Sequence, residues 1–164
     1  MPLAHSILKS PAILALVLGL ALAGCAKQTL PDNAGGLGLT ATPGSQQDFT
    51  VNVGDRIFFE TDSSALTATA RNTLDKQAQW LSRYAKYPIT IEGHADERGT
   101  REYNLALGAR RAAATRDYLV SRGVQSNRIH TISYGKERPV AVCNDISCWS
   151  QNRRAVTVLT APTG

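Results

Sequence analysis

The feature that most constrains the fold is an alternation of short apolar runs with two longer amphipathic segments. Four runs rich in β-branched and aromatic residues predict strands at 56–60, 89–92, 128–134 and 155–159. Helical periodicity predicts one helix over 67–84 and a second over 101–122, ended by Gly123. The small and apolar stripe of the second helix is Leu105, Gly108, Ala112, Thr115 and Leu119. The order β-α-β-α-β-β predicts an α+β fold (an α/β sandwich), a mixed sheet with helices packed on one face.

The N-terminus carries one lysine, Lys9, then an apolar run over 11–23 that ends in Leu22-Ala23-Gly24-Cys25. The run is too short for a transmembrane helix, which needs roughly 20 apolar residues. It resembles a bacterial lipoprotein signal with its lipobox. The resemblance implies a signal peptide over 1–24 and a Cys25 acylated into outer-membrane lipid, with the rest facing the periplasm. Ala26 fits this location, because an Asp there favours the inner membrane in the enterobacterial scheme. The alternative is an ordinary secreted protein with a stray cysteine.

After the signal, residues 25–47 are rich in Gly, Ala, Thr, Ser, Pro and Gln and predict a flexible periplasmic tether. Residues 48–164 have the length of a single domain. The full chain carries 18 Lys+Arg against 13 Asp+Glu, a formal charge of +5 at pH 7. A basic exported protein suits anionic headgroups, an anionic wall polymer or nucleic acid, and charge does not choose among them.

Two further cysteines, Cys143 and Cys148, lie close together in the sequence. In an oxidising compartment such a pair favours a disulfide, and closing so small a loop contributes about 2 kcal/mol in the chain-entropy description. A metal site is the alternative, but no second Cys or His pair lies near enough in sequence to complete a tetrahedral set.

Charges of both signs crowd the segment between the second strand and second helix, Gly93-His94-Ala95-Asp96-Glu97-Arg98-Gly99-Thr100. Such a loop is a usual place for a binding site. Asp96 offers an acceptor and Arg98 a fork of donors, which suits a zwitterionic ligand. Arg111, on roughly the same helix face as Asn104, could hold a carboxylate bidentately. The alternative is a solvated loop with ordinary surface ion pairs.

Several motifs follow one another in a fixed order: the run from Gly93 to Thr100, Glu102-Tyr103-Asn104, Leu107-Gly108-Ala109-Arg110-Arg111-Ala112, Tyr134-Gly135-Lys136-Glu137 and Asn152-Arg153-Arg154. Over nearly all of residues 50–160 the chain resembles the OmpA-like peptidoglycan-binding domains, and its lipobox resembles their lipoprotein branch. The resemblance implies non-covalent binding of the diaminopimelate branch of the peptidoglycan stem. It also implies TolB and other Tol proteins as partners and a role in envelope integrity and cell division. It implies no catalysis, cofactor or metal.

The resemblance also assigns roles. Asp96 receives the diaminopimelate ammonium, Arg111 grips its carboxylate, and Arg98 lines the pocket. Asp62 is an acid on the rim, in the context Glu60-Thr61-Asp62-Ser63 rather than the Gly-Phe-Asp of relatives. Asn104 fixes the loop. Arg153 and Arg154 either line the pocket or face the sheet surface.

Three other functions compete with this interpretation. For an enzyme or metal site, His94 and Asp96 could converge while Glu97 points away, and His130 stands alone in its strand. No hydrolase or zinc-protease motif occurs in the sequence. For nucleic acid, the second helix is basic but lacks a recognition motif, and it also carries acidic residues. The last alternative is an OmpA-like lipoprotein outside the Tol system that serves as a protein-interaction module.

Overall fold

The computed structural model describes residues 41–161. The predicted signal peptide, the acylation site Cys25 and the tether up to residue 40 lie outside the described residues. Within residues 41–161, no helix combines the length and apolar character that crossing a membrane requires.

The described chain follows the predicted order of strands and main helices, with extra short elements. The elements are α2 (Gln46–Asp48), a π-helical turn η1 (Phe49–Val53), β1 (Arg56–Phe58), α3 (Ala68–Arg83), β2 (Ile89–His94), α4 (Arg101–Ser121), a 3-10 turn η2 (Ser126–Arg128), β3 (Ile129–Gly135), α5 (Ile146–Asn152) and β4 (Arg154–Leu159). The predicted β-α-β-α-β-β core is confirmed, whereas α5, between the third and fourth strands, was not predicted.

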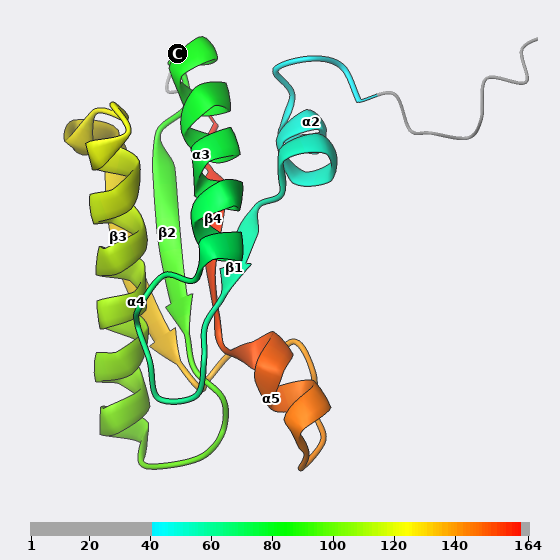
Figure 1. Cartoon of the computed structure of the whole chain (residues 1–164), viewed down its shortest axis with the longest axis vertical. Coiled ribbons are helices and arrows are strands. Elements are labelled where there is room, and N and C mark those ends of the chain that lie inside the picture. Colours follow the sequence, from blue (N-terminus) through cyan, green and yellow to red (C-terminus); the bar gives the residue numbers. More distant parts are fainter. Residues whose placement is uncertain (1–40, 162–164) are drawn as a thin grey trace, which may run out of the picture. The chain divides into compact units, whose positions relative to one another are not determined.

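The four strands form one mixed sheet in the order β1-β4-β2-β3. Strand β4 runs antiparallel to both β1 and β2, and β2 runs parallel to β3 with α4 as the connection between them. Figure 1 shows α3 and α4 on one face of this sheet, as predicted, with α5 beyond one end. The C-terminal ends of β1, β2 and β3 and the N-terminal start of β4 therefore lie at the same end of the sheet. The charged loop after β2 lies at that end too.

Both long helices begin at a capping threonine, and α4 is followed by a glycine suited to a helix end. The Thr67 hydroxyl accepts a hydrogen bond from the Ala70 amide (3.1 Å) at the start of α3, and the Thr100 hydroxyl accepts one from the Tyr103 amide (3.2 Å) at the start of α4. Gly123 follows α4 as predicted. Its φ of +94° is a left-handed conformation that glycine adopts more readily than other residues. The N-terminus of α4 is thereby fixed beside the charged loop.

Helix α4 lies very close to β2. A Cβ built on Gly93 would lie 1.9 Å from the carbonyl oxygen of Gly108, so neither position admits a side chain without moving the helix. The predicted stripe on α4 is wrong at Leu105, which is 43% exposed. The buried face instead consists of Asn104, Leu107, Gly108, Arg111, Ala112, Thr115 and Leu119. Two large polar residues, asparagine and arginine, thus belong to the packed face.

The domain begins earlier than the predicted boundary at residue 48. Ala41 is buried, and the Tyr87 hydroxyl donates to the Gly44 carbonyl at 2.8 Å. The Trp80 indole donates to the Asp48 carboxylate at 2.8 Å and packs on Phe49 with ring centroids 4.9 Å apart. Residues 41–47 therefore belong to the domain, because aromatic side chains of α3 and the loop after it hold a segment with few apolar residues of its own.

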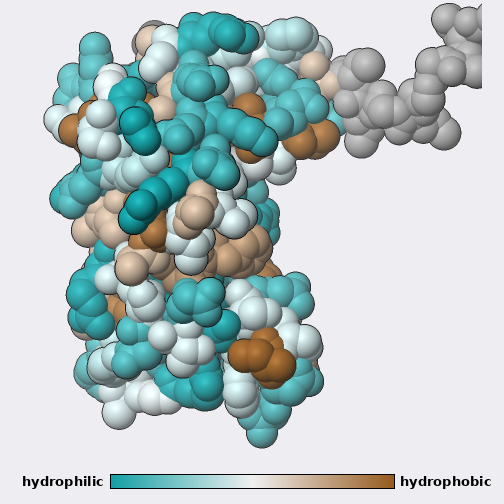
Figure 2. Space-filling model, in the orientation of Figure 1, coloured by the Kyte–Doolittle hydropathy of each residue, from teal (hydrophilic) through white to brown (hydrophobic). Residues whose placement is uncertain are grey.

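A single apolar core lies between the sheet and the two long helices. Its members include Ile57, Leu74, Leu81, Ile89, Ile91, Ala112, Leu119, Ile129, Ala155 and Leu159. On the side shown in Figure 2, hydrophilic residues predominate over the outer faces of α3 and α4, and apolar surface appears over α5. This agrees with helices that bury one face only.

Candidate functional site

A cavity of about 270 Å³ lies where the end of β1, the loop after β2 and the start of α4 meet. It is lined by Thr61, Asp62, Asp96, Arg98, Gly99, Tyr103, Asn104 and Leu107. Four of the residues predicted from the sequence, Asp62, Asp96, Arg98 and Asn104, are therefore brought together. Arg111 is not part of the lining.

The carboxylate of Asp96 is the buried anion of this cavity, with 7% of the residue exposed. Its two oxygens accept hydrogen bonds from the Arg98 guanidinium at 3.1 and 2.7 Å, and one of them lies 3.4 Å from Nη1 of Arg153. Burial by itself raises the pKa of Asp96, but the bonds from Arg98 and Arg153 outweigh it and hold the pKa below its ordinary value. Asp96 is consequently an ionised acceptor at neutral pH.

Arg153 and Arg154, left open by the sequence, point in opposite directions. Arg153 donates to the Phe59 carbonyl at 3.0 Å besides its contact with Asp96. Arg154 donates to the carbonyl of Arg138 at 3.1 Å, and burial is the main cause that lowers its pKa. Neighbouring residues entering a strand face opposite sides, so only Arg153 belongs to the site.

Arg111 lies fully buried in the face of α4 that packs on the sheet. Its three nitrogens donate to backbone oxygens, those of Ser63 at 2.8 Å, His94 at 2.8 Å and Glu60 at 3.1 Å. Burial, and next the nearby Arg153, lower its pKa to about 10, whereas Asp96 and Asp62 act in the opposite direction. The guanidinium therefore ties the loop after β1 to the end of β2.

Asp62 and Tyr103 close one side of the cavity. Asp62 adopts φ 55°, a left-handed conformation that aspartate tolerates better than most residues. Its carboxylate accepts a hydrogen bond from the Tyr103 hydroxyl, which raises the pKa of Tyr103. The sequence did not predict a role for Tyr103, although it lies in the motif Glu102-Tyr103-Asn104.

Asn104 has the loop-fixing contacts that were expected. Its side-chain amide donates to the carbonyls of Arg98 at 2.8 Å and Thr100 at 3.1 Å. Because Asn104 is buried in the first turn of α4, these bonds close the charged loop onto the helix.

His94 does not converge with Asp96. The register of β2 with β3 shifts between Gly93 and His94, and the His94 ring lies 5.6 Å from that of Tyr134 instead. Burial, and then the charge of nearby Arg154, lower the pKa of His94 to about 4. Over residues 41–161, no group of three or more His, Cys, Asp or Glu is placed to hold a metal ion.

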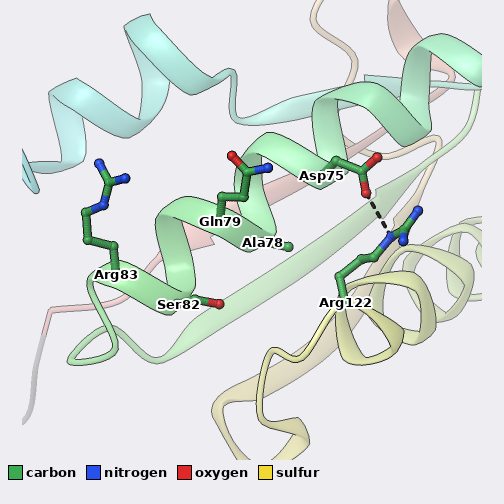
Figure 3. A pocket seen from close by; sticks show the side chains of 6 residues that line it. All are labelled: Asp75, Ala78, Gln79, Ser82, Arg83 and Arg122. Carbon is green, nitrogen blue, oxygen red and sulfur yellow. Dashed lines mark ion pairs between the residues drawn. The ribbon is translucent and has the colours of Figure 1, made fainter.

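A larger depression of about 700 Å³ lies between α3 and α4, with Asp75 and Arg122 on its walls (Figure 3). None of the predicted site residues lines it. Asp75 and Arg122 already pair at 2.8 Å, and Asp75 also accepts from the Tyr118 hydroxyl at 3.0 Å. The charges of Asp75 and Arg122 are thus satisfied by each other, and Arg83 also lines the depression.

Comparison with known proteins assigns the chain to a family. Residues 58–153 match the model of the OmpA family. A protein of Rhizobium meliloti (strain 1021) named peptidoglycan-associated lipoprotein is 75% identical over 159 residues, which are 94% of this chain and 90% of that protein. The chain belongs to the peptidoglycan-associated lipoproteins of the OmpA family.

Solved structures agree with membership of the peptidoglycan-associated lipoproteins. The crystal structure of the peptidoglycan-associated lipoprotein from Burkholderia pseudomallei is 38% identical, with a TM-score of 0.66 over 70% of this chain and 98% of that one. The C-terminal domain of Helicobacter pylori MotB has a TM-score of 0.62 at 22% identity, over 66% of this chain and 86% of that one. The MotB likeness concerns the fold alone.

Proposed function

We propose that the protein binds peptidoglycan non-covalently, with the cavity around Asp96 taking the zwitterionic end of the diaminopimelate residue. The ionised, buried Asp96 carboxylate carries this proposal. An ammonium suits Asp96 and the rim acid Asp62, and a carboxylate on the same carbon suits Arg98, whose side chain is 40% exposed. A ligand lacking either charge would make fewer charge-assisted hydrogen bonds with Asp96 or Arg98, which provides selectivity.

The proposed role of Arg111 differs from the one expected from the sequence. Five N–H groups belong to a guanidinium, and backbone oxygens take one at each of its three nitrogens. Because Arg111 is fully buried and does not line the cavity, its proposed role is to hold the loop after β1 beside the end of β2. Arg111→Ala would remove three structural hydrogen bonds, so a loss of binding in that variant would not by itself assign Arg111 a ligand contact.

At the level of the cell, the proposal is a link between outer membrane and wall. Acyl chains on Cys25 would hold the protein at the membrane, since each buried CH₂ contributes about 0.8 kcal/mol. A tether and a weak pocket suffice, because anchoring raises the effective concentration of the domain at the wall. As the resemblance to the OmpA-like lipoproteins implies, TolB and other Tol proteins would compete with the wall for binding to this protein during cell division. No catalytic step is part of the proposal.

Calorimetric titration of the purified protein tests the pocket. A stem peptide containing diaminopimelate should bind, and the same peptide with lysine should bind more weakly, because lysine lacks the second carboxylate. Asp96→Asn should weaken binding at least about tenfold, whereas Asp117→Asn, an exposed change on α4, should not. Equal affinity for both peptides would contradict the zwitterion argument.

A second candidate is an OmpA-like lipoprotein that serves a protein partner outside the Tol system. Co-purification with TolB from cross-linked cells distinguishes it. Recovery of TolB supports the Tol assignment, and recovery of a different envelope protein without TolB favours the second candidate.

A further inference from the structure

Arg98 is held between an acid and an aromatic ring. Its Nε and Nη2 donate to the two oxygens of Asp96 at 3.1 and 2.7 Å. On its other side, Cζ lies 4.1 Å from the centre of the Trp149 ring, a cation–π geometry. The indole N–H of Trp149 in turn donates to the carboxylate of Glu97, the residue before Arg98. Trp149 thus contacts the pocket loop at two consecutive residues.

Trp149 can act this way because α5 is fixed at both ends. Before it, the Asp145 side chain caps the helix, and a disulfide joins Cys143 to Cys148 with Cα atoms 5.6 Å apart. At its far end the buried Asn152 side chain accepts from the Val140 and Ala141 amides at 2.9 and 3.2 Å.

The chain continues from α5 directly into a second arginine of the site. Arg153 follows the helix, and its backbone oxygen accepts from the Phe59 amide at 2.9 Å while its side chain reaches Asp96. Both guanidinium groups that contact Asp96 therefore depend on the placement of α5, one through a ring and one through the backbone.

We infer that Trp149 is a positioning residue for stem-peptide recognition, which holds Arg98 against Asp96 so that the acceptor and donor reach the ligand as a pair of fixed geometry. This rests on the proposed function. A half-exposed arginine without the ring gains rotamers, and each binding event must then order it again. The Trp149 ring fixes the Arg98 side chain before the ligand binds. Trp149 therefore pre-organises the pocket and does not contact the ligand.

The first test uses the ligand-free protein and NMR. The ring current of Trp149 should shift the side-chain signals of Arg98 upfield, and Arg98→Lys identifies those signals. Trp149→Ala should move them to ordinary positions, while Trp149→Phe, which keeps a ring but loses the bond to Glu97, should retain most of the shift. Unchanged Arg98 signals in Trp149→Ala would overturn the inference.

The second test measures affinity for the diaminopimelate stem peptide. Trp149→Ala should bind about three- to fivefold more weakly, and Trp149→Phe should recover most of the loss. Wild-type affinity in folded Trp149→Ala, or an equal loss in both variants, would overturn the positioning role. If the wild-type protein binds no stem peptide, the proposed function is wrong, and so is a role of Trp149 in stem-peptide recognition. The NMR result still decides whether Trp149 holds Arg98.

Discussion

Replacing Arg111 by alanine should destabilise the domain by about 3 kcal/mol. Three carbonyl oxygens each lose a hydrogen bond from a charged group, which costs about 2 kcal/mol apiece, or roughly 6 kcal/mol together. The Glu60 carbonyl keeps its bond from the Ser63 amide at 3.3 Å. Against this, the variant no longer buries a guanidinium. The lowering of the Arg111 pKa from 12.5 to about 10 corresponds to roughly 3 kcal/mol of relief. The hydrogen bonds outweigh the relief, so the net effect is a loss of stability.

Urea unfolding followed by circular dichroism measures this loss. With a slope of about 2 kcal/mol per M, the midpoint should fall by roughly 1.5 M. Arg111→Lys keeps the charge but offers one nitrogen in place of three, so it should fall between alanine and wild type. The matched control is Arg110→Ala, the exposed neighbour on α4, which should change stability by no more than about 0.5 kcal/mol. An Arg111→Ala midpoint equal to that of Arg110→Ala would refute the argument that Arg111 ties the loop after β1 to the end of β2.

Three further changes test other parts of the structure. Replacing Cys143 and Cys148 by serine should lower the free energy of unfolding by about 2 kcal/mol; an unchanged urea midpoint would mean that α5 is held without the disulfide. Gly108→Ala would place a Cβ 2.3 Å from Oγ of Ser133, so thermal melting should show a loss of about 2 kcal/mol, and a wild-type melting temperature would contradict the close packing. Because the His94 pKa is lowered to about 4 from 6.5, the unfolded state binds more protons between these values. Stability should be full above pH 6.5 and fall by about 3 kcal/mol by pH 4, a dependence that His94→Gln should largely remove.

The sheet and its two long helices were predictable because periodicity reports burial directly. Ile89 and Ile91 alternate with polar residues along β2, and both are fully buried. The order of the strands was not predictable, because β4 inserts between β1 and β2 through contacts distant in sequence. Leu105 misled the assignment of the α4 stripe, because the sequence cannot tell an exposed leucine from a buried one near a helix start.

The residues that line the candidate site were predictable in part, and their contacts were less so. The motif order identified Asp96 and Arg98, and the cavity brings them together with Asp62 and Asn104. The role of Arg111 depends on which backbone oxygens surround it, and no sequence pattern records that. Helix α5 was missed because its seven residues have weak helix propensity, and a cap, a disulfide and a buried asparagine hold it in place.

The early start of the domain has a mechanical consequence. The segment from residue 41 packs around Trp80 and Tyr87, and Figure 1 shows α2 toward the opposite end of the sheet from α5. The pocket is lined from the loops that follow β1 and β2, at the α5 end of the sheet. A pull applied through residue 41 and resisted at Asp96 therefore acts along the strands. Inter-strand hydrogen bonds are then loaded in parallel, in shear, instead of breaking one after another as in peeling. A domain so oriented resists rupture through its unfolding barrier, which fits the link between membrane and wall proposed above.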